Sequence, residues 1–83
     1  MYFVYILKSL IHNRYYTGST GDLKKRLNYH NSGKVKSTKN YKPWEIIYIE
    51  NFNTKSEALR REKQIKSYKG GEAFKKLINS SQL

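Results

Sequence analysis

Arg26 and His30 are polar residues on a stretch with the spacing of an amphipathic helix. They lie four residues apart and flank the stripe formed by Leu23 and Leu27, so we expect both side chains to face the interior of the fold. A guanidinium can stabilise an anionic transition state, and an imidazole can move a proton. Each residue also has an ordinary explanation, since a lone arginine usually reaches solvent and a lone interior histidine is usually hydrogen-bonded.

Glu62 is the corresponding residue on a second expected helix. Ala58, Leu59 and Ile65 define the side of that helix that should face the core, and Glu62 falls between them. A carboxylate in that position must be paired, hydrogen-bonded or bound to a metal. The ordinary explanation is an ion pair with Lys66 or Arg26. Three such residues on two helices are harder to explain as packing than any one alone.

Glu62 is also the acidic residue without an evident structural task. A single carboxylate fits neither a two-metal site nor the paired carboxylates of a glycosidase. The chain also lacks a Gly-rich phosphate loop, a nucleophile elbow and a His-Glu-x-x-His motif. The other five acids have expected places as helix caps, in a first helical turn or at the ends of a strand: Asp22, Glu57, Glu72, Glu45 and Glu50.

Two tyrosine-rich segments, "YFVYILKS" and "NRYYTGST", read as the strands of a β-hairpin. If Lys8 pairs with Asn13, Tyr5 lies directly opposite Tyr16, with Cβ atoms about 5 Å apart. A slip of one residue would place the two rings on opposite faces. Tyr2 and Tyr15 are interpreted as packing residues.

The remaining pattern predicts the elements that position these side chains. A helix of about ten residues follows a cap at Thr20 or Asp22 and stops at Gly33, and Thr54 and Glu57 have capping-box spacing. The order β-β-α-β-α-α predicts an α+β fold, a three-stranded, mainly antiparallel sheet flanked by helices, in one domain over 1–83. The later elements are a basic loop, a strand ending near Phe52, a helix to about Tyr68, and a last helix that buries Phe74, Leu77 and Ile78.

Charge indicates a polyanionic partner. Seventeen Lys and Arg residues against six acids give a formal net charge of +11, which favours DNA. A membrane surface fits less well, because no basic amphipathic helix with a bulky apolar side is evident. The absence of cysteine suits the cytoplasm. Four lysines in the basic loop are expected to hold backbone phosphates, the alternative being a solvated lysine run: Lys34, Lys36, Lys39 and Lys42.

The ordered motifs resemble those of the GIY-YIG nuclease family, in particular its small single-domain bacterial members. "FVY" ending at Tyr5 stands where the family has its first motif, and "YTG" from Tyr16 to Gly18 stands where it has its second. Helices with "LKKRLNYHN" and "EALRREKQIK" follow. The resemblance covers about residues 2–69 and extends to the N-terminal catalytic domain of the incision subunit of bacterial nucleotide excision repair.

The resemblance implies a role for each matching residue. One of the two tyrosines, and Tyr5 before Tyr16, would be the general base, aided by positive charge from Arg26, the metal and the basic domain that favours the phenolate. Arg26 would stabilise the transition state, and His30 would assist proton movement or position Tyr16. Glu62 would bind one Mg²⁺ or Mn²⁺ ion. Gly18 would let the chain leave the second strand tightly beside the site.

The implied activity is a divalent-metal-dependent DNA endonuclease without an organic cofactor, in repair or recombination. One departure from the family pattern supports a different class of function. Many members have an asparagine after the glutamate helix, whereas "KSYKGGEAF" has none, and Asn79 lies too far along. A neighbouring lysine such as Lys66 would then contact the phosphate. The alternative is a non-catalytic nucleic-acid-binding module or adaptor with the same fold.

Overall fold

The structure is a computed structural model that describes residues 1–80, so the expected domain range of 1–83 ends outside the described residues. Three strands form one antiparallel sheet in the order β2-β1-β3, with β1 in the centre. The predicted fold class and element order are confirmed. Along the chain the elements are β1 (Tyr2–Ser9), β2 (Tyr15–Thr20), α1 (Leu23–Asn31), a 3₁₀ turn (Lys39–Tyr41), β3 (Trp44–Phe52), α2 (Lys55–Ser67) and α3 (Glu72–Asn79).

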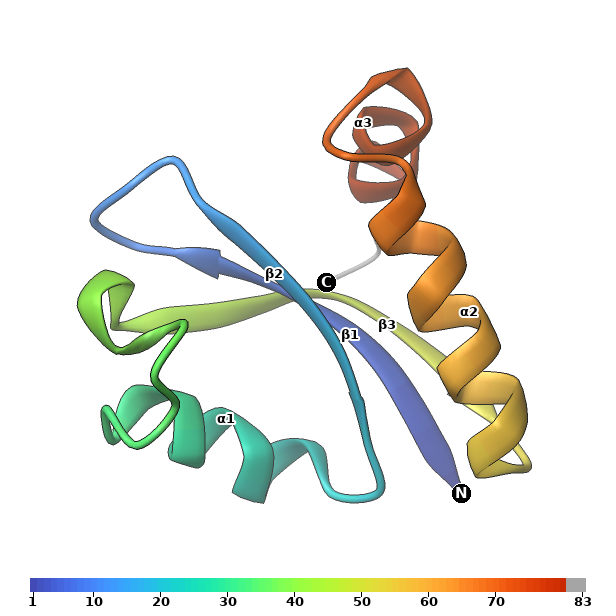
Figure 1. The fold of residues 1–83 in the computed structure, drawn as a ribbon, viewed down its shortest axis with the longest axis horizontal. Coiled ribbons are helices and arrows are strands. Elements are labelled where there is room, and N and C mark those ends of the chain that lie inside the picture. Colours follow the sequence, from blue (N-terminus) through green and yellow to red (C-terminus); the bar gives the residue numbers. More distant parts are fainter. Residues whose placement is uncertain (81–83) are drawn as a thin grey trace.

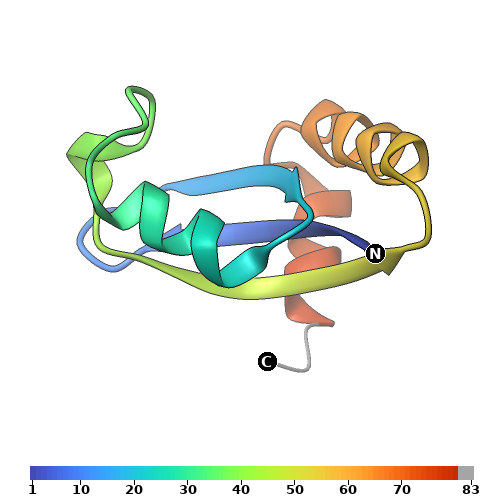
Figure 2. The same cartoon turned by 90° about the horizontal axis from the view of Figure 1, so that it is seen from below.

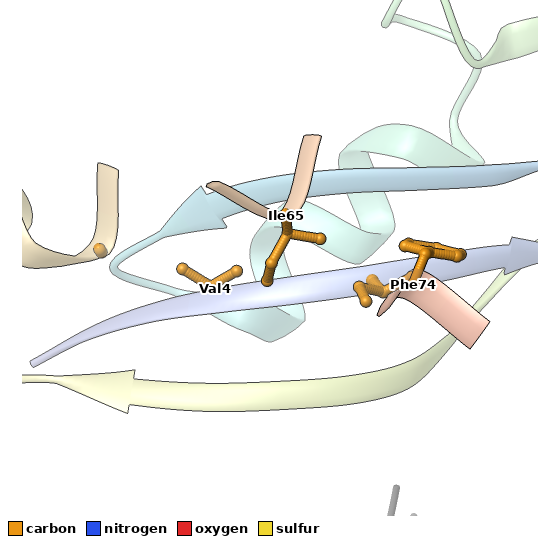
Figure 3. Packing of buried hydrophobic residues seen from close by; sticks show 5 residues of the cluster. Val4, Ile65 and Phe74 are labelled. Carbon is orange, nitrogen blue, oxygen red and sulfur yellow. The ribbon is translucent and has the colours of Figure 1, made fainter. Parts of the chain in front are cut away.

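Figure 1 shows the sheet between α1 on one side and α2 with α3 on the other, and Figure 2 shows α1 and α3 on opposite faces. The central strand is therefore buried on both faces. Val4 and Ile6 pack with α2 and α3, where they meet Ile65 and Phe74 (Figure 3). The alternate positions of β1 face α1. Complete burial of each such apolar side chain stabilises the fold by roughly 1.5–3 kcal/mol.

Local signals set the helix boundaries as predicted. The side chain of Asp22 accepts a hydrogen bond from the backbone N–H of Lys25 and caps α1. Thr54 and Glu57 form the capping box at the start of α2. Gly33 follows α1 with φ at +82°, a conformation that favours glycine. The basic loop differs from the prediction in one respect, because it contains the 3₁₀ turn.

The hairpin register differs from the expected one by two residues. Tyr5 lies opposite Gly18, and Tyr16 lies opposite Leu7. Ser9 explains the shift: its hydroxyl accepts the backbone N–H groups of Ile11 and His12 and donates to the Tyr41 carbonyl, which fixes a longer turn between the strands. Because the shift is two residues and not one, both tyrosines remain on the face that α1 covers.

The buried side of α2 also differs from the prediction at one position. Ala58 and Ile65 are buried, but Leu59 is 47% exposed, so it does not belong to the core. Arg61 takes part of the inner side and makes a bidentate pair with Glu50, with N–O distances of 2.8 and 2.9 Å. Within residues 1–80, no helix has the length and apolar character needed to cross a membrane.

Candidate active site

The hydroxyl of Tyr5 is the centre of a buried polar cluster between the sheet and α1. Tyr5 is only 2% exposed, and its hydroxyl lies 3.1 Å from Nε2 of His30. Nε of Arg26 donates to the same oxygen at 3.4 Å. Both partners come from α1, one helical turn apart, so the predicted inward placement of these two side chains is confirmed. Three groups that transfer protons or stabilise anions thus meet at one atom.

Tyr16 completes this cluster from the edge strand β2. Its ring centroid lies 4.8 Å from that of His30 and 6.4 Å from that of Tyr5. Nζ of Lys66 lies 5.9 Å from the centroid of the Tyr16 ring, so α2 also reaches the cluster. The two tyrosines are diagonal neighbours across the hairpin, not directly opposite residues.

Gly18 makes room for the Tyr5 phenol. It lies inside β2, so the expected tight exit from the strand at this residue is wrong. A Cβ atom at this position would lie 2.5 Å from Oη and 2.7 Å from Cζ of Tyr5. The missing side chain, and not backbone freedom, is therefore the property that the site needs.

Glu62 approaches the same edge of the sheet from the other face. Its Oε1 accepts a hydrogen bond from the Ser19 hydroxyl at 2.6 Å, and its Oε2 pairs with Nζ of Lys66 at 2.6 Å. Its side chain is 17% exposed, so it lies at the border of the core and not at its centre. Tyr5 contacts Gly18 and Glu62 contacts Ser19, which places the carboxylate and the phenol at adjacent residues of β2. The ordinary ion pair with Lys66 is also present.

Burial raises the pKa of the Tyr5 phenol, and the negative charge of the Glu62 carboxylate acts in the same direction. The hydrogen bond and charge of Arg26 lower it but do not compensate. Arg26 therefore favours the Tyr5 phenolate as expected, but burial outweighs it and the net pKa is raised. Burial, and next the charge of Arg26, lower the pKa of His30 to about 4. At neutral pH a protonated phenol thus faces a neutral imidazole.

The low pKa of His30 predicts that stability falls in mild acid. Between about pH 4 and 6.5 the unfolded chain binds a proton at this residue and the folded chain does not, so lowering the pH favours unfolding. Lowering the pH from 7 to 5 should reduce the free energy of unfolding by roughly 2 kcal/mol. Urea unfolding of the wild type and of His30→Gln measures this change, and an equal loss in both would contradict it. His12 is exposed and common to both proteins.

Open hollows flank the cluster on two sides. One is lined by Lys25, Arg26 and Tyr29 of α1, together with Thr20 at the end of β2 and the capping residue Asp22. The other lies beside Tyr16, between the end of the hairpin and the junction of α2 and α3, and has no acidic residue in its lining. Its cations are Arg14, Lys66 and Lys69. The lysines expected to hold phosphates are all exposed: Lys34, Lys36, Lys39, Lys42 and Lys66.

Comparison with known proteins assigns the domain. Residues 1–75 match the family model of the GIY-YIG catalytic domain. The chain belongs to the GIY-YIG family. A UPF0213 protein of Staphylococcus epidermidis is 47% identical over 68 residues, covering 81% of this chain and 82% of the relative. UPF0213 proteins of Staphylococcus haemolyticus and Staphylococcus aureus are each 44% identical over 68 residues, with the same coverage of both chains.

The solution NMR structure of the UPF0213 protein BH0048 from Bacillus halodurans is 33% identical to this GIY-YIG chain, with a TM-score of 0.47. The alignment covers 87% of this chain and 88% of the other. Membership in the family gives the chain a nuclease-type catalytic domain, which implies DNA as the substrate, and GIY-YIG nucleases generally use divalent metals.

The donor chemistry of this GIY-YIG site fits one Mg²⁺ or Mn²⁺ ion. Mg²⁺ is commonly held by one or two carboxylates and completes its shell with water and substrate phosphate. Glu62 is such a carboxylate, partly exposed beside the cluster. No group of three or more His, Cys, Asp or Glu residues with metal-binding placement occurs in residues 1–80. An ion at Glu62 would compete with Lys66 for the carboxylate.

Proposed function

We propose that the chain is a divalent-metal-dependent endonuclease that hydrolyses phosphodiester bonds of DNA in repair or recombination. The observation that carries the proposal is the contact of Tyr5 with both His30 and Arg26, beside the Glu62 carboxylate. These groups supply a proton acceptor, a fixed positive charge and a ligand for one ion. The net charge of +11 supports a polyanionic substrate.

Tyr5 and His30 act together as the base. Tyr5 is a neutral phenol at pH 7, so it takes a proton from the attacking water only as its own proton leaves. Nε2 of His30, 3.1 Å away, is the acceptor for that proton. The anionic phosphate of the substrate opposes the effect of Arg26 on His30 and so makes the imidazole a better base at the moment of reaction. Tyr16 packs against the imidazole and limits its movement.

Arg26 stabilises the charge that develops on the phosphorus centre. Its hydrogen bond to Tyr5 raises its pKa further, so the guanidinium stays charged at any working pH. It is only partly buried and lines an open hollow that a phosphate can enter. Glu62 on α2 would hold a divalent ion, which would supply Lewis-acid polarisation of the scissile phosphate. Arg26 on α1 supplies positive charge from the other side.

The two hollows provide cations on both sides of the reacting centre. Lys25 and Arg26 lie on one side, and Arg14, Lys66 and Lys69 lie on the other. Such contacts go to phosphates and position a strand without reading its sequence. The exposed lysines of the loop before β3 extend the basic surface. We therefore propose that one DNA strand passes over the edge strand β2.

A cleavage assay tests the proposal. Purified protein is incubated with supercoiled plasmid and with branched, flapped and damaged duplexes, in Mg²⁺, in Mn²⁺ and in EDTA. We expect nicking with either ion and none in EDTA. Glu62→Ala should lower the rate by roughly 100-fold or more, because it removes the ligand of an ion whose Lewis-acid effect is worth several kcal/mol. Glu45→Ala, at an exposed carboxylate of β3, should leave it unchanged.

The same assay distinguishes the adaptor alternative. Tight, salt-dependent DNA binding without cleavage of any substrate in either ion would overturn the nuclease proposal and favour a binding module. Cleavage that persists unchanged in Glu62→Ala and Arg26→Ala would reject the site. Cleavage of one branched or damaged substrate above the others would identify the process that the enzyme serves.

A further inference from the structure

Thr38 is a buried hydroxyl residue that contacts the far side of His30. It lies between α1 and β3, immediately before the 3₁₀ turn, and is 1% exposed. Its Oγ1 lies 2.9 Å from Nδ1 of His30, on the side of the imidazole opposite Tyr5. Its backbone is fixed as well, because its carbonyl accepts the indole N–H of Trp44 at 3.0 Å. The hydroxyl is therefore held against one imidazole nitrogen.

Hydrogen-bond satisfaction decides which nitrogen of the neutral imidazole carries the proton. With the proton on Nδ1, His30 donates to Thr38, and the Thr38 hydroxyl donates to the carbonyl of Val35 at 3.4 Å. Nε2 is then free to accept the hydroxyl proton of Tyr5. Every hydrogen-bond donor in the series from Tyr5 through His30 and Thr38 to Val35 then has an acceptor.

The other tautomer leaves one donor unsatisfied. With the proton on Nε2, the oxygen of Tyr5 would receive N–H groups from both His30 and Arg26. Its own O–H would then have no acceptor among residues 1–80, at a site almost closed to solvent. An unsatisfied buried donor is costly, which favours the proton on Nδ1.

We propose that Thr38 is a positioning residue whose hydroxyl holds His30 in the tautomer that can accept the proton of Tyr5. The inference rests on the proposed function. As the water oxygen bonds to phosphorus and the bond to the leaving oxygen breaks, a water proton moves to the Tyr5 oxygen. The original Tyr5 proton moves to Nε2 of His30, which becomes an imidazolium. Nδ1 keeps its proton and its bond to Thr38 throughout, and the imidazolium later releases a proton to solvent while the leaving oxyanion takes one up.

Nitrogen-15 NMR of histidine-labelled protein reads the tautomer directly, without DNA or metal. At pH 7 we expect Nδ1 of His30 in the protonated, pyrrole-like range and Nε2 in the unprotonated, pyridine-like range. His12, which is exposed, serves as the internal reference. Wild-type His30 with its proton on Nε2 would overturn the proposal.

Two variants attribute the tautomer to the hydroxyl. Thr38→Val keeps the shape of the side chain but removes the acceptor of Nδ1–H, so the tautomer equilibrium should move toward Nε2–H. Thr38→Ser keeps the hydroxyl and should keep the wild-type pattern. Thr38→Ala replaces the valine variant if that protein does not fold. An unchanged Nδ1–H tautomer in the variant that lacks the hydroxyl would overturn the role of Thr38.

Cleavage under saturating protein supplies the second readout. Thr38→Val should lower the rate roughly tenfold or more at unchanged DNA affinity, and Thr38→Ser should restore it. A loss of affinity with an unchanged rate would contradict a positioning role. If the wild type shows the Nδ1–H tautomer but cuts no DNA, the proposed nuclease function fails while the assignment of Thr38 to His30 stands, so the two failures are distinguishable.

Discussion

Replacing Gly18 by alanine is expected to lower the cleavage rate by roughly 100-fold, because a displacement of about 1 Å at a reacting group has an effect of that size. The new methyl group would lie 2.5 Å from Oη of Tyr5 and 3.1 Å from the ring of Tyr16. Tyr5 is buried and bonded to His30 and Arg26, so its phenol cannot swing aside without breaking those contacts. Overpacking should also destabilise the fold by about 1–3 kcal/mol.

Gly21→Ala is the matched control for this variant. The nearest atom to a Cβ at Gly21 is Cε1 of Tyr2 at 3.7 Å, an ordinary contact, so both rate and stability should be retained. Urea unfolding measures the stability of each variant and so shows whether a lower cleavage rate comes from loss of the fold or from a local change around Tyr5. A Gly18→Ala protein with wild-type rate and stability would show that the phenol does not require the space over β2.

The same glycine shows where reasoning from the sequence stops. The motif identified Gly18 as a site residue, but a tight turn was the wrong reason for it. Whether a glycine provides backbone freedom or space depends on the neighbour across the sheet. That neighbour is set by the register, and the serine at the end of β1 shifted the register by two residues. Local side-chain bonds of this kind leave little trace in hydrophobic alternation.

The elements themselves follow from local signals. Capping by Asp22, Thr54 and Glu57, together with apolar periodicity, predicts the helices to within a residue or two, because these interactions lie within a few positions of one another. Leu59 shows the limit: helical spacing places it near the buried side, but Arg61 and its pair with Glu50 occupy that border. Which of the two residues lies at the edge of the buried side of α2 depends on the strand that packs there, because Glu50 of β3 pairs with Arg61.

The contacts around the candidate site are the least predictable part. Arg26 and His30 could be proposed because they share one helix turn with an apolar stripe. Thr38 and Ser19, which bond His30 and Glu62, occupy a loop and an edge strand with no periodicity to mark them. Small hydroxyl residues are common in such places, and only their tertiary partners distinguish them.

Replacing Tyr5 by phenylalanine is expected to lower the cleavage rate by roughly 10²- to 10⁴-fold, the range associated with a general base. The change removes one hydroxyl and keeps the ring that packs over Gly18. Tyr2→Phe is the control, because Tyr2 packs against the core beneath α2 and lines neither hollow. Tyr16→Phe, measured in parallel, decides which tyrosine is the base. A larger loss in Tyr16→Phe than in Tyr5→Phe would reverse the assignment.

A double-mutant cycle with His30→Gln tests whether Tyr5 and His30 act as one unit. Groups that act as a unit give grossly non-additive losses, so the double variant should be about as slow as the slower single variant. Additive losses would mean that Tyr5 loses its proton without His30.

The dependence of the cleavage rate on pH distinguishes the same two routes. Burial raises the pKa of Tyr5, and loss of its proton without His30 therefore predicts a rate that keeps rising with pH to about 10 or beyond. Transfer to a neutral His30 predicts instead a rate that is flat from neutral to mildly alkaline pH, since neither group changes its charge in that interval.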